Sequence, residues 1–277
     1  MIGLIPEMFT YPFMCRAFAV GSLIALCAAL LGVTLVLKRY SMIGDGLSHV
    51  GFGALAIASA MNAAPLAVAI PVVMAAAVAL LYLSENSRIH GDAAIALIST
   101  GSLAVGVTVV SMTTGMNTDV YNYLFGSILS MSEGDVVLTA VISAAVLVVF
   151  LLFYNRIFAV TFDETFARAT GIRTGRLSIL IAVLTALVIV IGMRMMGSLL
   201  ISSLVVFPAL TSMRVFKTFR GVMISAGIVS VVCLLLGLTI SYLHATPTGA
   251  SIVLCNIAAF FIYLGISKVR EKTYNKG

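Results

Sequence analysis

Two potential metal ligands lie four positions apart in an apolar part of the chain. Asp45 and His49 stand in the stretch G-D-G-L-S-H-V at 44–50. At 3.6 residues per helical turn, side chains four positions apart project from the same face. A carboxylate and a neutral imidazole together suit Zn²⁺ or Mn²⁺ and poorly suit a soft ion such as Cu(I). The spacing therefore predicts a divalent-metal site on one face of a helix.

Two ligands from one helix do not fill the coordination sphere of such an ion. A second copy of the chain, related by a two-fold axis, would supply two more, so a homodimer could hold the ion between its halves. A purely structural interpretation is equally open from the residues alone. In that case Asp45 caps the helix or pairs with Lys38 or Arg39, and His49 bonds a neighbouring carbonyl group.

A further candidate ligand is His244, which precedes the stretch A-T-P-T-G at 245–249. It could bind an ion on the outer side of the pathway. The alternative is an exposed residue before a turn, which the following proline and glycine favour. His244 therefore stands behind Asp45 and His49 as a candidate.

A polar loop at about 155–176 has a helical pattern over 162–172. Phe162, Phe166 and Ala169 fall on one side, acidic residues stand at the start, where a helix dipole favours anions, and a glycine follows the end. The segment is a candidate docking element for a partner protein, or alternatively a helix lying on the bilayer surface. The candidate docking residues are Asp163, Glu164, Phe166, Arg168 and Gly171.

The composition indicates a lipid environment for these residues. Of 277 residues, 61% are hydrophobic and 9% are charged, whereas about a quarter of the residues in an ordinary soluble domain are charged. This excludes a soluble enzyme, a disordered chain and a nucleic-acid-binding domain. The motifs H-E-x-x-H, G-x-S-x-G and G-x-x-x-x-G-K-[ST] are absent, so we expect no catalytic activity, no permanently bound cofactor and no nucleotide site in this chain.

Nine apolar segments are long enough to be helices that cross a bilayer, each needing roughly 20 residues. We expect a single all-α domain over 1–277 with eight or nine spans, because Pro208 and a serine pair interrupt the seventh segment and could make it broken or re-entrant. Asp45 and His49 fall inside the second segment, and an ionisable residue within a span is a functional candidate. The segments are 13–37, 42–61, 65–83, 93–114, 136–154, 177–193, 197–215, 222–243 and 251–266.

Basic residues indicate the orientation of the chain. They follow the first, third, fifth, seventh and ninth segments, whereas the loops after the second, fourth and eighth contain none and the loop after the sixth contains only Arg194. Cytoplasmic loops carry the excess of lysine and arginine. This pattern predicts an outer N-terminus, a cytoplasmic C-terminus and a cytoplasmic 155–176 loop.

In order and spacing, several short motifs resemble the membrane permease subunit of the ABC-3 family of metal-uptake ABC transporters, over nearly the whole chain. Each motif alone is weakly specific. Relatives often have an acidic residue at the position of Ala245, which this chain lacks. The motifs are S-M-I-G-D-G-L-S-H at 41–49, G-D-A-A-I-A at 91–96, Y-L-F-G-S-I at 123–128, the loop at 162–172, G-S-L-L at 197–200 with F-P-A at 207–209, and T-P-T-G-A-S-I-V-L at 246–254.

The resemblance implies a homodimer in the bacterial cytoplasmic membrane, two cytoplasmic ATPase subunits and an extracellular metal-binding protein. It assigns Asp45 and His49 to the metal pathway and the helix near 163–171 to contact with the ATPase. We therefore expect an ATP-driven importer of divalent metal ions, zinc before manganese or iron, by alternating access. The alternative is a carrier or channel that moves the metal without a partner.

Overall fold

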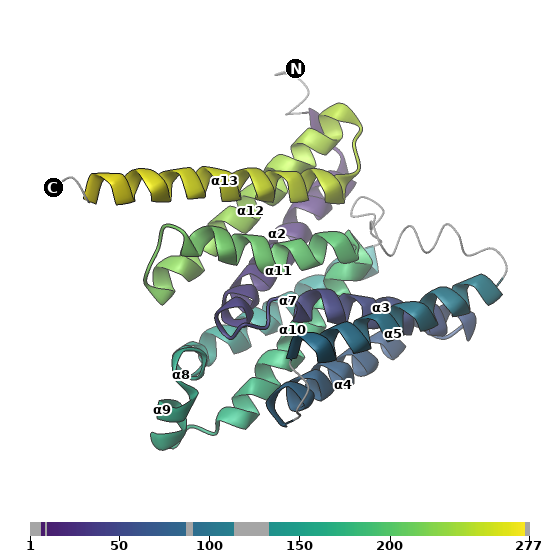
Figure 1. Cartoon of the computed structure of the whole chain (residues 1–277). Helices are drawn as coiled ribbons and strands as arrows, with labels where there is room; N and C mark the ends of the chain where they lie inside the picture. Colours follow the sequence, from purple (N-terminus) through teal and green to yellow (C-terminus); the bar gives the residue numbers. More distant parts are fainter. Residues whose placement is uncertain (1–6, 9, 87–90, 114–132, 275–277) are drawn as a thin grey trace.

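The computed structural model describes residues 7–8, 10–86, 91–113 and 133–274, and within these ranges every regular element is a helix. The all-α class predicted from the apolar runs is therefore confirmed. Figure 1 shows the helices packed at several angles around α2, α10 and α11. In chain order the helices are α2 (Pro12–Leu37), α3 (Ile43–Ala60), α4 (Pro65–Asn86), α5 (Gly91–Met112), α7 (Glu133–Leu152), α8 (Tyr154–Phe162), α9 (Glu164–Ala169), α10 (Thr174–Met196), α11 (Ser198–Met213), α12 (Phe219–His244) and α13 (Thr248–Tyr274).

Each of the nine predicted apolar segments corresponds mainly to one helix, although the segment 136–154 runs past the end of α7 into the start of α8. Among the described residues, seven helices have the length and apolar composition to cross a membrane, namely α2, α4, α5, α7, α10, α12 and α13. The other two segments form α3 and α11, which are 18 and 16 residues long and are not among the seven. Seven candidate spans are therefore found in the part of the chain that the structure describes, and the predicted eight or nine are not confirmed.

Among the described residues, prolines lie at helix starts and also inside two helices, as Pro71 of α4 and Pro208 of α11. Pro12 and Pro65 begin α2 and α4, where the missing N–H group would have had no helical partner. Pro208 lies inside α11, yet this helix runs without a break from Ser198 to Met213. Of the two predicted alternatives, a broken helix is therefore wrong, whereas a re-entrant helix stays a prediction. Pro208 removes one backbone hydrogen bond but does not end the helix.

The helices fall into two groups of neighbours. Helices α11 and α12 pack against α2, and α13 packs against α11 and α12, whereas α3 packs against α4, α5, α10 and α11. In Figure 1 the α8–α9 segment, the α11–α12 connection and the C-terminal end of α13 lie towards the left, and the α12–α13 connection and the end of α5 lie towards the right. The three segments on the left are among those predicted to be cytoplasmic, and the two on the right are among those predicted to lie outside.

Glycines allow close contact between helices at two places that matter for the site. A Cβ atom at Gly53 of α3 would lie 2.8 Å from the carbonyl oxygen of Ser102 in α5. A Cβ atom at Gly32 of α2 would collide with the carbonyl group of Val205 in α11. These glycines let α3 approach α5 and α2 approach α11 closely, as small residues do at contacts between membrane helices.

Candidate functional site

Helix α3 holds Asp45 and His49 on one face, as their spacing predicted. The Nε2 atom of His49 lies 3.6 Å from the Oδ2 atom of Asp45. The Asp45 side chain is 48% exposed and the His49 side chain 22% exposed. The Nδ1 atom of His49 is buried and has no hydrogen-bond partner among the described residues. The carboxylate is therefore accessible, whereas the imidazole is held mostly within the protein.

Two glycines on either side of Asp45 bring neighbouring helices close to it. A Cβ atom at Gly44 would lie 3.5 Å from Val205 of α11, and one at Gly46 would lie 2.8 Å from Ile95 of α5. The hydroxyl group of Ser202, also on α11, lies near the Asp45 carboxylate, and it is buried without a hydrogen-bond partner among the described residues. Helices α5 and α11 thus frame the carboxylate, and Ser202 adds an oxygen that the sequence analysis did not select.

The Asp45 side chain neither caps α3 nor forms an ion pair with Lys38, which were two of the structural alternatives. The residue at the N-cap of α3 is Met42, and no side chain caps this helix. Lys38 instead contacts Glu164 and Ser178. Asp45 therefore occupies the first turn of α3 without capping it, and its carboxylate is available for another role.

One copy of the chain does not assemble a larger ligand cluster from the part that the structure describes. There, no group of three or more His, Cys, Asp or Glu side chains could hold a metal ion together. His244 is exposed at the last turn of α12, followed by Ala245 in the left-handed conformation with φ 51°. His244 thus lies at a helix end before a turn and joins no such cluster. The predicted motif at 123–128 lies outside the described residues.

The predicted docking segment consists of two helices in place of one. Asp163 is extended, with φ −147° and ψ 95°, and separates α8 from α9. Its carboxylate accepts a hydrogen bond of 2.8 Å from the backbone N–H of Phe166 and so caps the N-terminus of α9. The predicted common face of Phe162, Phe166 and Ala169 is therefore wrong, because the break at Asp163 places Phe162 on a different helix. The buried side chain of α9 is Ala167.

The end of α9 agrees with the sequence prediction. Gly171 has φ +85°, a conformation that glycine adopts without strain. The backbone N–H groups of Gly171 and Ile172 donate to the carbonyl groups of Arg168 and Ala167 at 3.1 and 3.0 Å. The ring of Phe166 is left 65% exposed. The segment therefore presents an apolar side chain on a helix whose two ends are fixed.

Lys38 fastens this segment to the helices of the bundle. Its Nζ atom lies 3.6 Å from a carboxylate oxygen of Glu164 in α9 and 3.1 Å from the hydroxyl of Ser178 in α10. The side chain of Lys38 is only 11% exposed. Glu164 also contacts Arg168 at 3.3 Å. Lys38 follows directly after α2, so a single cation joins α2, α9 and α10.

Two further cations form ion pairs at the start of α7. Arg16 lies 2.5 Å from Glu133, and Arg194 lies 3.2 Å from Asp135. The pairs tie α7 to α2 and α10.

The sequence model of the ABC 3 transport family matches residues 10–267. The chain belongs to the ABC 3 transport family. The resemblance found in the short motifs is therefore confirmed, and the ABC 3 chain is a multi-pass membrane permease.

Three similar proteins show how broad this family is. The ABC 3 chain is 28% identical to the high-affinity zinc uptake system membrane protein ZnuB of Haemophilus influenzae, over 92% of the chain and 97% of ZnuB. It is 27% identical to the manganese transport system membrane protein MntC of Halalkalibacterium halodurans, over 90% of the chain and 85% of MntC. Among solved structures, PsaBC from Streptococcus pneumoniae in complex with Fab matches with a TM-score of 0.85 and 28% identity, covering 95% of both chains.

Proposed function

We propose that this ABC 3 chain is the membrane subunit of an ATP-driven importer of divalent transition-metal ions, in which Asp45 and His49 line the metal pathway. The observation that carries the proposal is the accessible carboxylate of Asp45 beside the imidazole of His49, 3.6 Å apart on one helix face. A dication cannot enter hydrocarbon without ligands that replace its water. Carboxylate and imidazole groups supply such ligands and suit zinc, manganese or iron(II).

A homodimer would complete the coordination sphere. Because two ligands are too few for a stable site, two copies of α3 facing each other would provide four. Such a site can be opened by moving the two halves apart, which suits a transported ion better than a permanently bound one. Zinc is the first expectation and manganese or iron the next, and the relatives are named for both zinc and manganese transport.

The α8–α9 segment would contact an ATPase subunit on the cytoplasmic side. The exposed ring of Phe166 offers a knob for a partner pocket, and the Asp163 cap and Gly171 give α9 fixed ends. Movement of the partner on ATP binding would reach α2 and α10 through Lys38 and so change which side of the membrane the metal site faces. An extracellular metal-binding protein would deliver the ion to the other side.

The orientation proposed from the basic loops fits this arrangement. The α8–α9 segment and the C-terminal end of α13 lie at one end of the bundle (Figure 1), and both belong to the stretches rich in lysine and arginine. This end would face the cytoplasm of a bacterial cell, and the C-terminus with it.

Uptake of radioactive zinc by cells grown without added metal tests the site. Asp45→Ala and His49→Ala should each abolish uptake, while the complex still assembles and its ATPase subunits still bind ATP. His244→Ala is the matched control, because it removes an exposed imidazole outside the pair, and it should retain uptake. Full uptake by both α3 variants would refute the assignment. Competition among Zn²⁺, Mn²⁺ and Fe²⁺ in the same assay would identify the preferred ion.

A carrier that works without an ATPase would use the same ligands but would not need the α8–α9 segment. Phe166→Ala should uncouple ATP hydrolysis from uptake if the segment contacts an ATPase. Phe261→Ala is the control, because this ring is similarly exposed, at 62%, but lies on α13. Metal flux through the purified chain alone in liposomes, unaffected by Phe166→Ala, would favour the carrier.

A further inference from the structure

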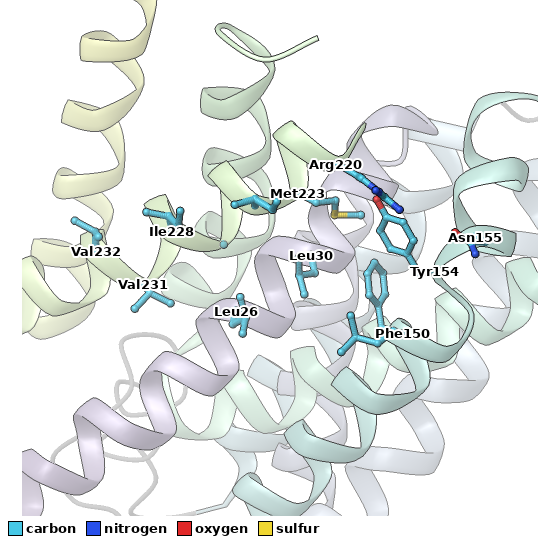
Figure 2. A pocket seen from close by; sticks show the side chains of 13 residues that line it. Leu26, Leu30, Phe150, Tyr154, Asn155, Arg220, Met223, Ile228, Val231 and Val232 are labelled. Atoms are coloured by element: carbon cyan, nitrogen blue, oxygen red, sulfur yellow. The ribbon is translucent and has the colours of Figure 1, made fainter. Parts of the chain in front are cut away.

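A long apolar groove lies on a side of the molecule away from the Asp45–His49 pair. Its volume is about 1000 Å³, and it is formed by α2, α7, α8 and α12. Figure 2 shows apolar side chains along most of the groove, among them Leu26, Leu30, Phe150 and Ile228. No step of the proposed transport cycle uses this groove.

The groove has the length of one leaflet of a bilayer. The residues of α12 that line it run from Arg220 to Val232, which is about 18 Å at the rise of an α-helix. The hydrocarbon of one leaflet is about 15 Å deep, half of the bilayer core. Ile224 and Ile228 at its rim are 65% and 58% exposed. The groove is therefore open towards the surroundings of the helix bundle over the depth of an acyl chain.

Polar groups line only one end of the groove. Arg220 of α12 and Tyr154 and Asn155 of α8 lie there, and the side chains of Arg220 and Tyr154 point to the same end in Figure 2. Arg220 stands in the first turn of α12, which contains no acidic residue, although a helix N-terminus disfavours a cation. Among the described residues, no ion pair involves Arg220. An anion at this end would be favoured by both the arginine and the helix dipole.

We propose that this groove binds an anionic phospholipid, with an acyl chain along α12 and the phosphate group at Arg220 and the hydroxyl group of Tyr154. Such a lipid fits both parts of the groove. Its acyl chain suits the apolar part, and its negatively charged phosphate group suits the end that contains Arg220. On the proposed orientation, the site faces the cytoplasmic leaflet. The ring of Tyr154 lies 5.5 Å from that of Phe219, and Phe219 also contacts Phe158 of α8. Lipid in the groove would therefore hold α8 against α12.

A second copy of the chain fits the groove less well. A two-fold axis along the membrane normal would place both copies of Arg220 at the same depth, where two cations without acidic partners repel each other. If the α12 of that copy met the groove, it would also bring no acid to the polar end, because the first turn of α12 has none. The phosphate of a lipid supplies the missing charge.

Tryptophan fluorescence in the reconstituted complex tests the proposal, because the chain contains no tryptophan. Ile228→Trp places a reporter at the rim of the groove, eight residues after Arg220. Ile262→Trp on α13 is the matched control, because Ile262 is 61% exposed and lies eight residues before Arg270. Quenching is measured with brominated phosphatidylglycerol or brominated phosphatidylcholine at equal fractions, after subtraction of the signal of the complex without a reporter.

We expect brominated phosphatidylglycerol to be preferred at Ile228→Trp by up to about tenfold, the size of one charge-assisted contact, with no preference at Ile262→Trp. Arg220→Gln should remove the preference, and Tyr154→Phe should reduce it without changing the apolar groove. Equal quenching by both lipids at Ile228→Trp, or a preference that survives Arg220→Gln, would overturn the proposal. Absence of quenching by either lipid would also overturn it, since protein would then cover the groove.

Discussion

Replacing Lys38 with glutamine should weaken the connection between α9 and the helices of the bundle while leaving the Asp45–His49 pair intact. The substitution removes the cation that lies 3.6 Å from Glu164 and 3.1 Å from Ser178. An effective dielectric constant of 20 gives a gross attraction of about 4–5 kcal/mol at this separation. Desolvation and side-chain ordering cancel most of this gain.

The net contribution of this contact should be about 1–2 kcal/mol, between the value of a surface pair and that of a buried one. The estimate follows from the exposed fractions, 11% for Lys38 and 34% for Glu164. Glu164 keeps its contact with Arg168 in the variant, so α9 itself should stay folded. A loss of this size changes the equilibrium between docked and detached α9 by about 5- to 30-fold.

The assay is the number of metal ions transported per ATP hydrolysed in proteoliposomes that contain the complete transporter. Lys38→Gln should lower this ratio, whereas Arg39→Gln should not, because Arg39 is the adjacent cation and is exposed. The double variant with Glu164→Gln should add little to either single change, since both remove the same contact. A normal ratio in Lys38→Gln, or fully additive effects in the double variant, would refute the reasoning.

Three further substitutions test parts of the framework. Gly32→Ala should lower the free energy of unfolding by about 1–3 kcal/mol, because its Cβ would collide with the backbone of α11. The control Gly265→Ala adds a Cβ with nothing within 4 Å, so the melting temperature of the complex should stay unchanged or rise slightly. Equal melting temperatures for the Gly32→Ala and Gly265→Ala complexes would contradict this prediction. Asp163→Ala should cost α9 about 1 kcal/mol through its lost cap and speed amide hydrogen exchange there, whereas Asp163→Asn should not; unchanged exchange would show that the cap is dispensable. Arg194→Gln should lose the 3.2 Å contact with Asp135 and lower stability by up to about 1 kcal/mol, with normal metal uptake; loss of uptake at full stability would assign Arg194 a transport role.

The helices could be predicted from the sequence because each apolar run exceeds the length of a strand and ends at polar or glycine-rich residues. The boundary between α7 and α8 could not be predicted from the sequence. The predicted span at 136–154 ran past the break at Phe153, which has φ −96° and ψ 6°. No proline or glycine marks this position, so local sequence carries no signal for the change of direction.

The spacing of Asp45 and His49 was sufficient to place both on one face, because four residues make about one helical turn. The neighbours of the pair were not predictable in the same way. Ser202 lies far along the chain from Asp45, and Lys38 is 126 positions from Glu164. Such contacts depend on how the helices pack, which a single sequence does not record. From the sequence alone, Asp45, seven positions after Lys38, was an equally plausible partner.

The exposed rings on the α8–α9 segment also set a condition on how the protein is made. Phe162 and Phe166 are 57% and 65% exposed, and on the proposed orientation both face the cytoplasm of a cell that has not yet supplied the partner. Apolar rings in water attract chaperones, proteases and other unfolded chains. We therefore expect a permease synthesised in excess of its ATPase to be degraded, so that the abundance of one subunit limits the abundance of the other.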